Sequence, residues 1–189
     1  MKHIFIVTGP SGVGKTYLSN YLGKHYPGEF ETLNIVTTRK PRKLAHEGDR
    51  DFLTLDEFNT QKNAGAFFAS GMYNANCYGF PFVPDNPEKH VLFNIWPALV
   101  PEFAKIKNVV LIALTVDSTG EQLLAKRLGD RYASQPNTLE KRMSVVKNDI
   151  DEISKNTMLI SDHGKIFTVT SDETIHDEVI PFMLQKLQA

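Results

Sequence analysis

The sequence lacks most of the features that mark a secreted, membrane-spanning or nucleic-acid-binding protein. Its single cysteine, Cys77, cannot form a disulfide within the chain, which suits a reducing compartment. The longest clear apolar stretch, residues 109–116, is much shorter than the roughly 20 residues that cross a bilayer. A formal net charge of -1 gives no general attraction for polyanions. We therefore expect a cytoplasmic protein whose partners include neither a membrane nor a nucleic acid polymer.

Familiar metal and hydrolase motifs are missing as well. The 6 histidines show no ligand spacing with Cys77 or with one another, so we expect no zinc site. There is no G-x-S-x-G turn to present a nucleophilic serine, and no N-K-x-D motif to read guanine in the manner of a nucleotide switch. The 189 residues, of which 41% are hydrophobic, are enough for one domain with its own core.

One motif stands out near the start of the chain. It fits G-x-x-x-x-G-K-[ST], follows the apolar run of residues 4–7, and reads Gly9-Pro10-Ser11-Gly12-Val13-Gly14-Lys15-Thr16. Its glycines allow backbone conformations in which successive N–H groups turn inward on a phosphate. A glycine-rich turn with a chance lysine is the alternative, but every fixed position is filled and both flanks agree. The motif predicts a strand, a phosphate-binding loop and a helix start.

This motif assigns roles to its last two residues. Lys15 would neutralise the outer phosphates of a nucleotide, and the hydroxyl of Thr16 would be a ligand for Mg²⁺. The helix that begins there would point its positive N-terminal end at the same anion. ATP and Mg²⁺ are therefore the expected cofactors.

Strand-like and helix-like runs alternate along the chain, which favours an α/β fold with a mainly parallel sheet. Residues 37–84 differ, with short β segments and one helix that Thr54 and Glu57 begin as a capping box. We expect this segment to be a substrate lobe. The other predicted strands are at residues 3–8, 90–95, 109–116 and 165–170. The other predicted helices are at 15–26, at 122–128, from 139 onward, and at 173–187. A second capping box, at Ser118, precedes the helix at 122–128.

The helix that begins at about residue 139 is expected to be amphipathic. Its apolar residues fall three or four apart and predict a core-facing stripe: Leu139, Met143, Val146, Ile150 and Ile153. Asp149 and Asp151 lie in the polar part of the same helix, and we expect both on its solvated face. The polar segment 129–137 just before it is expected to be a mobile loop.

A basic cluster at residues 37–43 is the second candidate site. Such clusters are usually solvated turns, and this one also resembles a nuclear localisation patch. In a chain with a phosphate loop a third interpretation is credible, because guanidinium groups grip phosphate oxygens in bidentate fashion. Arg39 and Arg42 are the candidates for holding an acceptor phosphate.

A third group of cations follows residue 125. A helix C-terminus favours cations, and this alone would explain Lys126 and Arg127. It does not explain Arg131 in the predicted loop. Phosphoryl transfer needs positive charge over the transferring group, and a loop that closes on bound nucleotide can deliver it. Arg127, Arg131 and Arg142 are therefore candidates for that task.

The order and spacing of these motifs resemble the guanylate kinases and related nucleoside monophosphate kinases. The resemblance covers nearly the whole chain and rests on G-P-S-G-V-G-K-T, T-T-R-K-P-R, F-L-T-L-D-E-F, N-C-Y-G-F-P, K-R-L-G-D-R and K-R. It implies transfer of a phosphoryl group from ATP to a nucleoside monophosphate, with Lys15 and Thr16 at the donor site. It also implies that Arg39, Arg42 and Tyr78 hold the acceptor phosphate.

The chain departs from this family where guanine would be read. Ile35 replaces a hydroxyl residue, Ala69 a glutamate and Phe80 a serine or threonine. An Asp-x-Asp expected after the next core strand is Asn94-Ile95-Trp96. A tyrosine expected to contact the acceptor phosphate is Arg50. One interpretation is another phosphorylated acceptor, either a different nucleotide or a phosphosugar such as ribose bisphosphate. The other is that compensating side chains preserve guanine binding. Loss of a carboxylate at Asn94 would also weaken catalysis.

Together these patterns predict one domain over residues 1–189 with a P-loop NTPase-type core. The core comprises residues 1–36 and 85–189, the acceptor lobe about 37–84 and the lid about 129–138. The expected partner is a small phosphorylated acceptor, and the expected state is a monomer or homodimer. A catalytically weak or protein-interaction domain is the alternative to a kinase.

Overall fold

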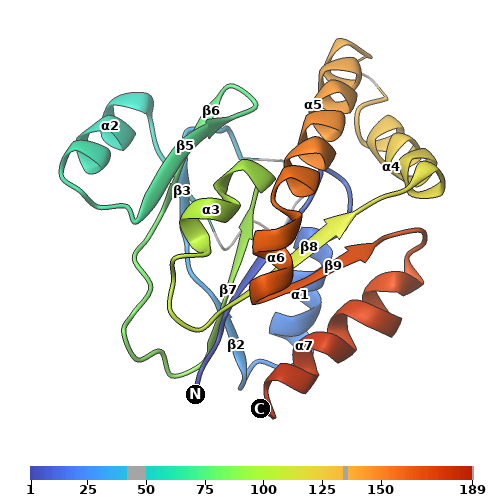
Figure 1. The fold of residues 1–189 in the computed structure, drawn as a ribbon. Coiled ribbons are helices and arrows are strands. Elements are labelled where there is room, and N and C mark those ends of the chain that lie inside the picture. Colours follow the sequence, from blue (N-terminus) through green and yellow to red (C-terminus); the bar gives the residue numbers. More distant parts are fainter. Residues whose placement is uncertain (42–49, 134–135, 189) are drawn as a thin grey trace.

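The computed structural model describes residues 1–41, 50–133 and 136–188, with the backbone alone for 136–138. Among these residues the chain forms a five-stranded parallel sheet and a separate four-stranded sheet (Figure 1). The large sheet has the strand order β2 (Phe30–Thr32), β7 (His90–Ile95), β1 (Ile4–Thr8), β8 (Val109–Thr115), β9 (Gly164–Thr168). The expected α/β fold with a mainly parallel sheet is confirmed.

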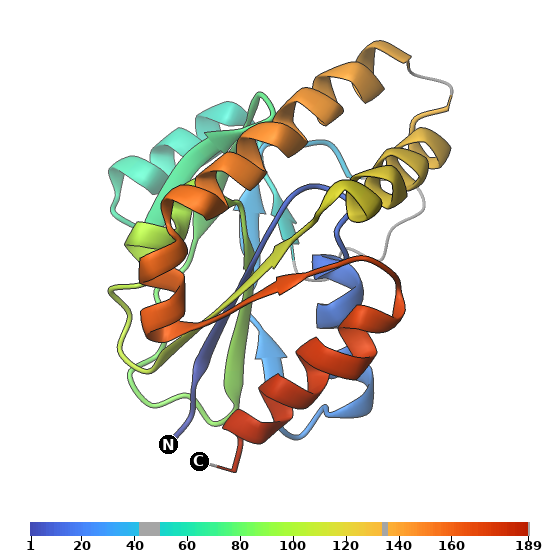
Figure 2. The ribbon, with the colours of Figure 1, turned by 45° about the vertical axis from the view of Figure 1, so that its right-hand side comes forward.

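Helices cover both faces of the large sheet (Figure 2). Successive residues of β1 point to opposite faces, so that Phe5 and Val7 join one hydrophobic cluster and Ile4 and Ile6 the other. Helices α1 (Lys15–His25) and α7 (Ile180–Lys186) contribute to the first cluster. The second receives residues from α3 (Val100–Phe103), α5 (Pro136–Lys155) and α6 (Thr157–His163). Burial on both faces explains why β1 reads as an uninterrupted apolar run.

The small sheet forms the lobe that the sequence predicts, beginning at Ile35 rather than at residue 37. Its order is β4 (Arg50–Phe52), β3 (Ile35–Thr37), β6 (Asn76–Phe80), β5 (Ala69–Tyr73), with β3 and β4 parallel and the other pairs antiparallel. Helix α2 (Leu55–Asn63) lies at its outer side (Figure 1). The predicted capping box is confirmed, because Thr54 accepts from the backbone N–H of Glu57 and the Glu57 carboxylate accepts from that of Thr54.

The loop expected at residues 129–137 is mostly helix where the structure describes it, which leaves out 134 and 135. Helix α4 (Ser118–Arg131) continues to Arg131, and α5 begins at Pro136. A proline is tolerated in the first turn of a helix because its missing N–H would have no partner there, so Pro136 starts α5 rather than interrupting a loop. The N-cap of α4 is also one residue earlier than predicted: the Asp117 carboxylate accepts from the backbone N–H groups of Thr119 and Gly120.

The C-terminal helix is less regular than the single run expected at residues 173–187. It begins at Glu173 as predicted, passes through a π-helical turn, Ile175–Val179, and continues as α7, with Pro181 in the first turn of that helix. A short 3₁₀ turn, Pro97–Leu99, follows β7. Among the described residues, no helix is both long enough and apolar enough to pass through a bilayer.

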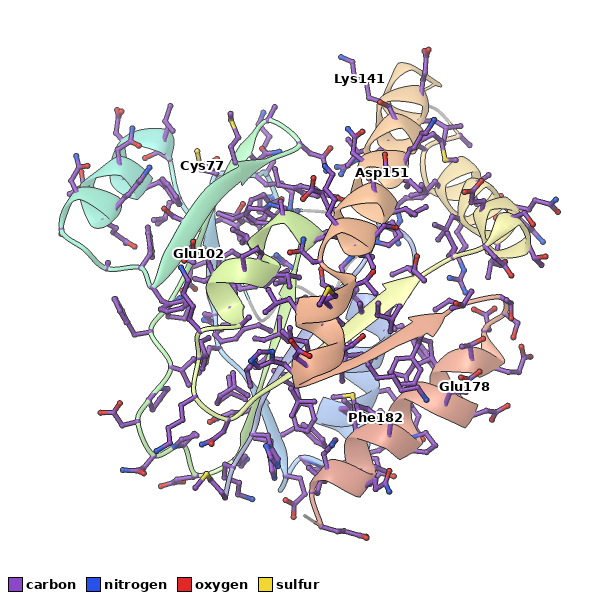
Figure 3. The ribbon with its side chains drawn as sticks, viewed as in Figure 1. Cys77, Glu102, Lys141, Asp151, Glu178 and Phe182 are labelled. Carbon is purple, nitrogen blue, oxygen red and sulfur yellow. The ribbon has the colours of Figure 1, made fainter. Side chains whose placement is uncertain are left out.

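A buried hydrogen bond joins the two lobes. The hydroxyl of Tyr73, on β5, donates to a carboxylate oxygen of Asp149, on α5, over 2.6 Å. Asp149 is 5% exposed, so its expected place on the solvated face is wrong; Asp151 is exposed on the same helix as predicted (Figure 3). Burial raises the pKa of Asp149 to about 6, although the Tyr73 hydrogen bond and the charge of Lys15 act to lower it.

Asp149 is therefore expected to make the stability of the protein depend on pH. With its pKa raised in the folded state, Asp149 binds more protons than in the unfolded chain between about pH 4 and pH 6. The free energy of unfolding should therefore fall as the pH rises through that range, by about 3 kcal/mol for a shift from 3.8 to about 6. We predict that Asp149→Asn lacks this fall, which urea unfolding at several pH values will measure.

The matched control is Asp151→Asn, because Asp151 is exposed on the same helix. Its stability profile should run parallel to that of the wild type. Parallel profiles for wild type and Asp149→Asn would instead contradict the assignment of the pH dependence to Asp149.

Two glycines of α4 provide a second test of the fold. A Cβ at Gly120 would lie 2.2 Å from the carbonyl oxygen of Val169, whereas one at Gly129 would meet nothing within 4 Å. Gly120→Ala should therefore destabilise the protein by about 1–3 kcal/mol through overpacking. Gly129→Ala should stabilise it by about 0.5–1 kcal/mol, because alanine loses less backbone entropy in a helix. Thermal or urea unfolding measures both, and equal effects from the two variants would show that the close approach at Gly120 is wrong.

Candidate active site

The phosphate-loop motif begins where β1 ends. Gly12 and Gly14 have φ angles of 87° and 119°, which side chains with a Cβ rarely adopt. A Cβ at Gly9 would lie 2.4 Å from the carbonyl oxygen of Leu114, so this turn passes directly over β8. Val13 is fully buried and anchors the loop in the core. The predicted strand, loop and helix start are all present at this place.

Lys15 reaches back into the loop that precedes it. Its ammonium donates to the carbonyl oxygens of Gly9 (2.5 Å) and Pro10 (2.9 Å), which uses two of its three N–H donors. Burial lowers its pKa to about 8, and the nearby charges of Arg50 and Arg131 act in the same direction. Asp149 partly opposes this effect. Lys15 therefore stays mostly protonated at neutral pH and can meet an anion.

One cavity of about 550 Å³ connects the loop to the small sheet. Its lining includes five residues of the motif, several cations, and a group of apolar and aromatic side chains. The residues are Ser11, Gly12, Gly14, Lys15, Thr16, Tyr17, Ile35, Arg39, Arg50, Tyr73, Tyr78, Phe80, Asn94, Ile95, Trp96, Arg127, Arg131, Arg142, Asp172, Ile175 and His176. Most of the site residues suggested by the sequence thus face one space.

The three arginines expected over the transferring group all line this cavity, in different surroundings. Arg131 lies at the end of α4, and the Arg142 guanidinium lies 5.7 Å from the centre of the Tyr132 ring. Arg127 donates to the carbonyl oxygen of Gly12 over 2.9 Å and forms an ion pair with Asp172. Arg127 is therefore placed to brace the phosphate loop, and Arg131 and Arg142 are the better candidates for contact with phosphate.

Arg39, Arg50 and Tyr78, the described residues that the sequence predicts at the acceptor phosphate, line the same cavity. Arg39 follows β3, and its guanidinium lies 5.4 Å from the centre of the Phe52 ring. Arg50 begins β4, and Tyr78 lies on β6 opposite Thr37. Arg42, the second predicted phosphate ligand, lies outside the described residues.

The apolar positions that depart from the family pattern gather at one end of the cavity. Ile35, Phe80 and Trp96 line it, and Ala69 is paired with Phe80 across the small sheet. Ala69 itself is buried in the core rather than lining the cavity. Ile35 and Phe80, on β3 and β6, and Trp96, in the segment after β7, therefore form an apolar wall of the cavity, with Phe80 and Trp96 in ring contact.

Asn94 presents a free oxygen beside the phosphate loop. The Ser19 hydroxyl donates to the carbonyl oxygen of Lys15, so it accepts from the Asn94 amide N–H over 2.7 Å. This arrangement leaves Asn94 Oδ1 buried and without a hydrogen-bond partner among the described residues. Together with the Thr16 hydroxyl it offers oxygen ligands, the kind that Mg²⁺ takes alongside nucleotide phosphates. The described part of the chain contains no cluster of three or more histidine, cysteine or acidic side chains that could hold a metal.

Sequence reasoning missed several residues of the cavity. Tyr73 lines it, and its partner Asp149 is buried outside the lining; neither carries a motif, and only their hydrogen bond across the lobes reveals them. At the opposite end, the Tyr17 hydroxyl and a ring nitrogen of His176 are 2.6 Å apart, and Asp172 pairs with Arg127. For this end of the cavity, the local signal in the sequence was the position of Tyr17 directly after Gly14-Lys15-Thr16, which places it next to the phosphate loop.

Comparison with known proteins agrees with this geometry. The guanylate kinase family model matches residues 1–164. The chain is 32% identical over 179 residues to a guanylate kinase of Mycoplasma genitalium, covering 90% of this chain and 72% of that protein. It is 31% identical over 156 residues to that of Mycoplasma pneumoniae, covering 79% and 65%.

Comparison with solved structures shows that the fold is also that of a guanylate kinase. A guanylate kinase from Anaplasma phagocytophilum has a similar structure, with a TM-score of 0.64 and 20% identity over 99% of this chain and 86% of that one. A family match over most of the chain and a phosphate loop that shares one cavity with the acceptor-side arginines lead to one conclusion: the chain belongs to the guanylate kinase family.

Proposed function

We propose that the protein transfers the γ-phosphoryl group of ATP to a nucleoside monophosphate. One observation carries this proposal: the phosphate loop and the acceptor-side arginines line the same cavity. A phosphate loop alone would support only nucleotide binding. A second cationic site that opens on the same space supports transfer between two bound phosphates.

The proposed reaction is a direct in-line displacement. A phosphate oxygen of the acceptor attacks the γ-phosphorus, the bond to the β–γ bridging oxygen breaks, and ADP leaves. Lys15, Arg131 and Arg142 stabilise the negative charge on the transferring group, and Arg39 and Tyr78 hold the acceptor phosphate. The ends of α4 and α5 around residues 129–138 are the proposed lid, which would exclude water from this space.

Mg²⁺ is the cation that fits the oxygen groups beside the loop. The Thr16 hydroxyl and Asn94 Oδ1 are the residues that would hold it, with the remaining ligands from phosphate and water. When bound, Mg²⁺ would neutralise charge on the phosphates of ATP. Asn94 contributes a dipole where a carboxylate would contribute a full charge, so we expect weak binding of the cation.

We predict that Lys15→Ala lowers phosphoryl transfer by at least about 100-fold, because its ammonium is the cation closest to the phosphate loop. The assay is ADP production in the presence of ATP, Mg²⁺ and a panel of nucleoside monophosphates, with circular dichroism to confirm folding. Lys24→Ala, at an exposed position on the same helix, is the control and should keep wild-type turnover. Unchanged turnover of Lys15→Ala would refute the donor-site assignment.

We also predict that Asn94→Asp strengthens Mg²⁺-dependent binding of ATP. A carboxylate in place of the amide adds a negative charge next to the cation, which should lower the Mg²⁺ concentration at half-saturation by about three- to tenfold. Isothermal titration calorimetry of ATP at a series of Mg²⁺ concentrations measures this effect. Asn20→Asp adds the same charge at an exposed position of α1 and should leave the Mg²⁺ dependence unchanged. Weaker binding by Asn94→Asp would place Asn94 away from the cation.

A further inference from the structure

Trp96 lies at the end of the cavity where apolar residues depart from the family pattern. Its indole stacks on the Tyr73 ring, with centroids 5.3 Å apart and planes at 16°. It also contacts the rings of Tyr78 and Phe80 at 5.6 Å and 5.7 Å. A Cβ at Gly71 would lie 2.9 Å from the indole, so the backbone of β5 supports its edge. The indole is thus held on several sides and still lines the cavity.

The wall behind Trp96 is apolar and closed. Ile35 and Phe80 line the cavity and are 3% and 1% exposed, and Phe80 packs against the rings of Phe93 and Phe103. None of these side chains can accept or donate a hydrogen bond. A guanine edge placed against them would bury the O6 and N7 acceptors and the amino donor without partners, at about 1–3 kcal/mol for each group.

These observations point to Trp96 as a specificity-determining residue. Building on the kinase activity proposed above, we propose that the Trp96 indole blocks guanine and that the acceptor is a pyrimidine nucleoside monophosphate whose base stacks on the exposed part of the indole. The phosphate end keeps its cations, Arg39 among them, and Tyr78 lies between that end and the indole.

Size and chemistry both favour a pyrimidine. The indole takes space at the base end of the cavity, which a single ring tolerates better than the fused rings of a purine. Stacking reads the face of a base rather than its edge, and it is worth about 1–3 kcal/mol per base. A base held by its face keeps its polar edge in the open part of the cavity, so the apolar wall leaves no buried group without a partner.

Trp96 is also the built-in reporter for this proposal, because it is the chain's single tryptophan. The wild-type protein is titrated with CMP, UMP and dTMP, and separately with GMP and ribose 5-phosphate, while indole emission is recorded. At least one pyrimidine nucleotide should quench or shift the emission with a Kd at least about tenfold below that of either GMP or ribose 5-phosphate.

Substitutions at Trp96 test whether the indole causes this preference. In Trp96→Ala, GMP should bind at least about tenfold more tightly relative to the pyrimidine nucleotide than in the wild type. Trp96→Phe should keep most of the preference, because a ring remains. Isothermal titration calorimetry measures both variants, since neither contains a tryptophan.

A second pair of variants leaves the indole in place. Gly71→Ala puts a methyl group against it, and φ at Gly71 lies outside the left-handed region, so alanine fits the backbone. It should shift the Trp96 emission and weaken the pyrimidine nucleotide by about tenfold. Ser70 is on the same strand but its side chain points to the other face of the sheet, so Ser70→Ala should change neither property.

The outcomes separate this proposal from the proposed function. If GMP binds wild-type protein most tightly, or if the base preference survives in Trp96→Ala, the role of Trp96 is wrong while kinase activity can still stand. Equal binding of ribose 5-phosphate and the pyrimidine nucleotides would also overturn it, because the base would then contribute nothing. If ATP is never consumed with any acceptor, the proposed function itself fails.

Discussion

The position of β1 between β7 and β8 is the constraint on which the rest of the site depends. Parallel pairing aligns Thr8 with Ile95 on one side and with Ala113 on the other. Because parallel strands end at the same edge of a sheet, the phosphate loop after β1 and the Trp96 segment after β7 must emerge side by side. The phosphate loop and the Trp96 end of the cavity are therefore brought together by sheet register before any side chain makes a contact.

Charge is the second constraint, because the cavity concentrates cations in a chain whose net charge is only -1. Arg50 and Arg131 disfavour the charged form of Lys15, and burial acts in the same direction. The charge of Asp149 opposes both effects and so favours the charged form of Lys15. The hydrogen bond from Tyr73 keeps that carboxylate from being left without a partner.

Local patterns in the sequence were enough to predict the central elements. The phosphate loop, the strand before it and the capping box at Thr54 each depend on residues within a few positions of one another. The core stripe of α5 was also visible, and Val146 and Ile153 are buried as expected. The lobe that contains the small sheet could be placed because its short β segments interrupt the longer alternation of the core.

The incorrect predictions concern a residue whose burial depends on long-range packing and a proline that begins a helix. Asp149 is at the edge of the apolar stripe, where its charge favours a solvated position, and its partner Tyr73 is 76 positions away, so the helical pattern could not show what would satisfy it in the core. The predicted loop around Pro136 failed for a different reason. Proline is compatible with both a loop and the first turn of a helix, and only the path of the chain distinguishes the two.

The base end and the donor end of the cavity are linked by side chains in contact. Trp96 stacks on Tyr73, Tyr73 donates to Asp149, and the charge of Asp149 acts on Lys15. A change at the base end that moves Tyr73 therefore removes a hydrogen bond from Asp149 and raises its pKa further, which weakens the support that Asp149 gives to the charge of Lys15. Trp96, Tyr73, Asp149 and Lys15 thus form one chain of interactions that connects the small sheet to the phosphate loop.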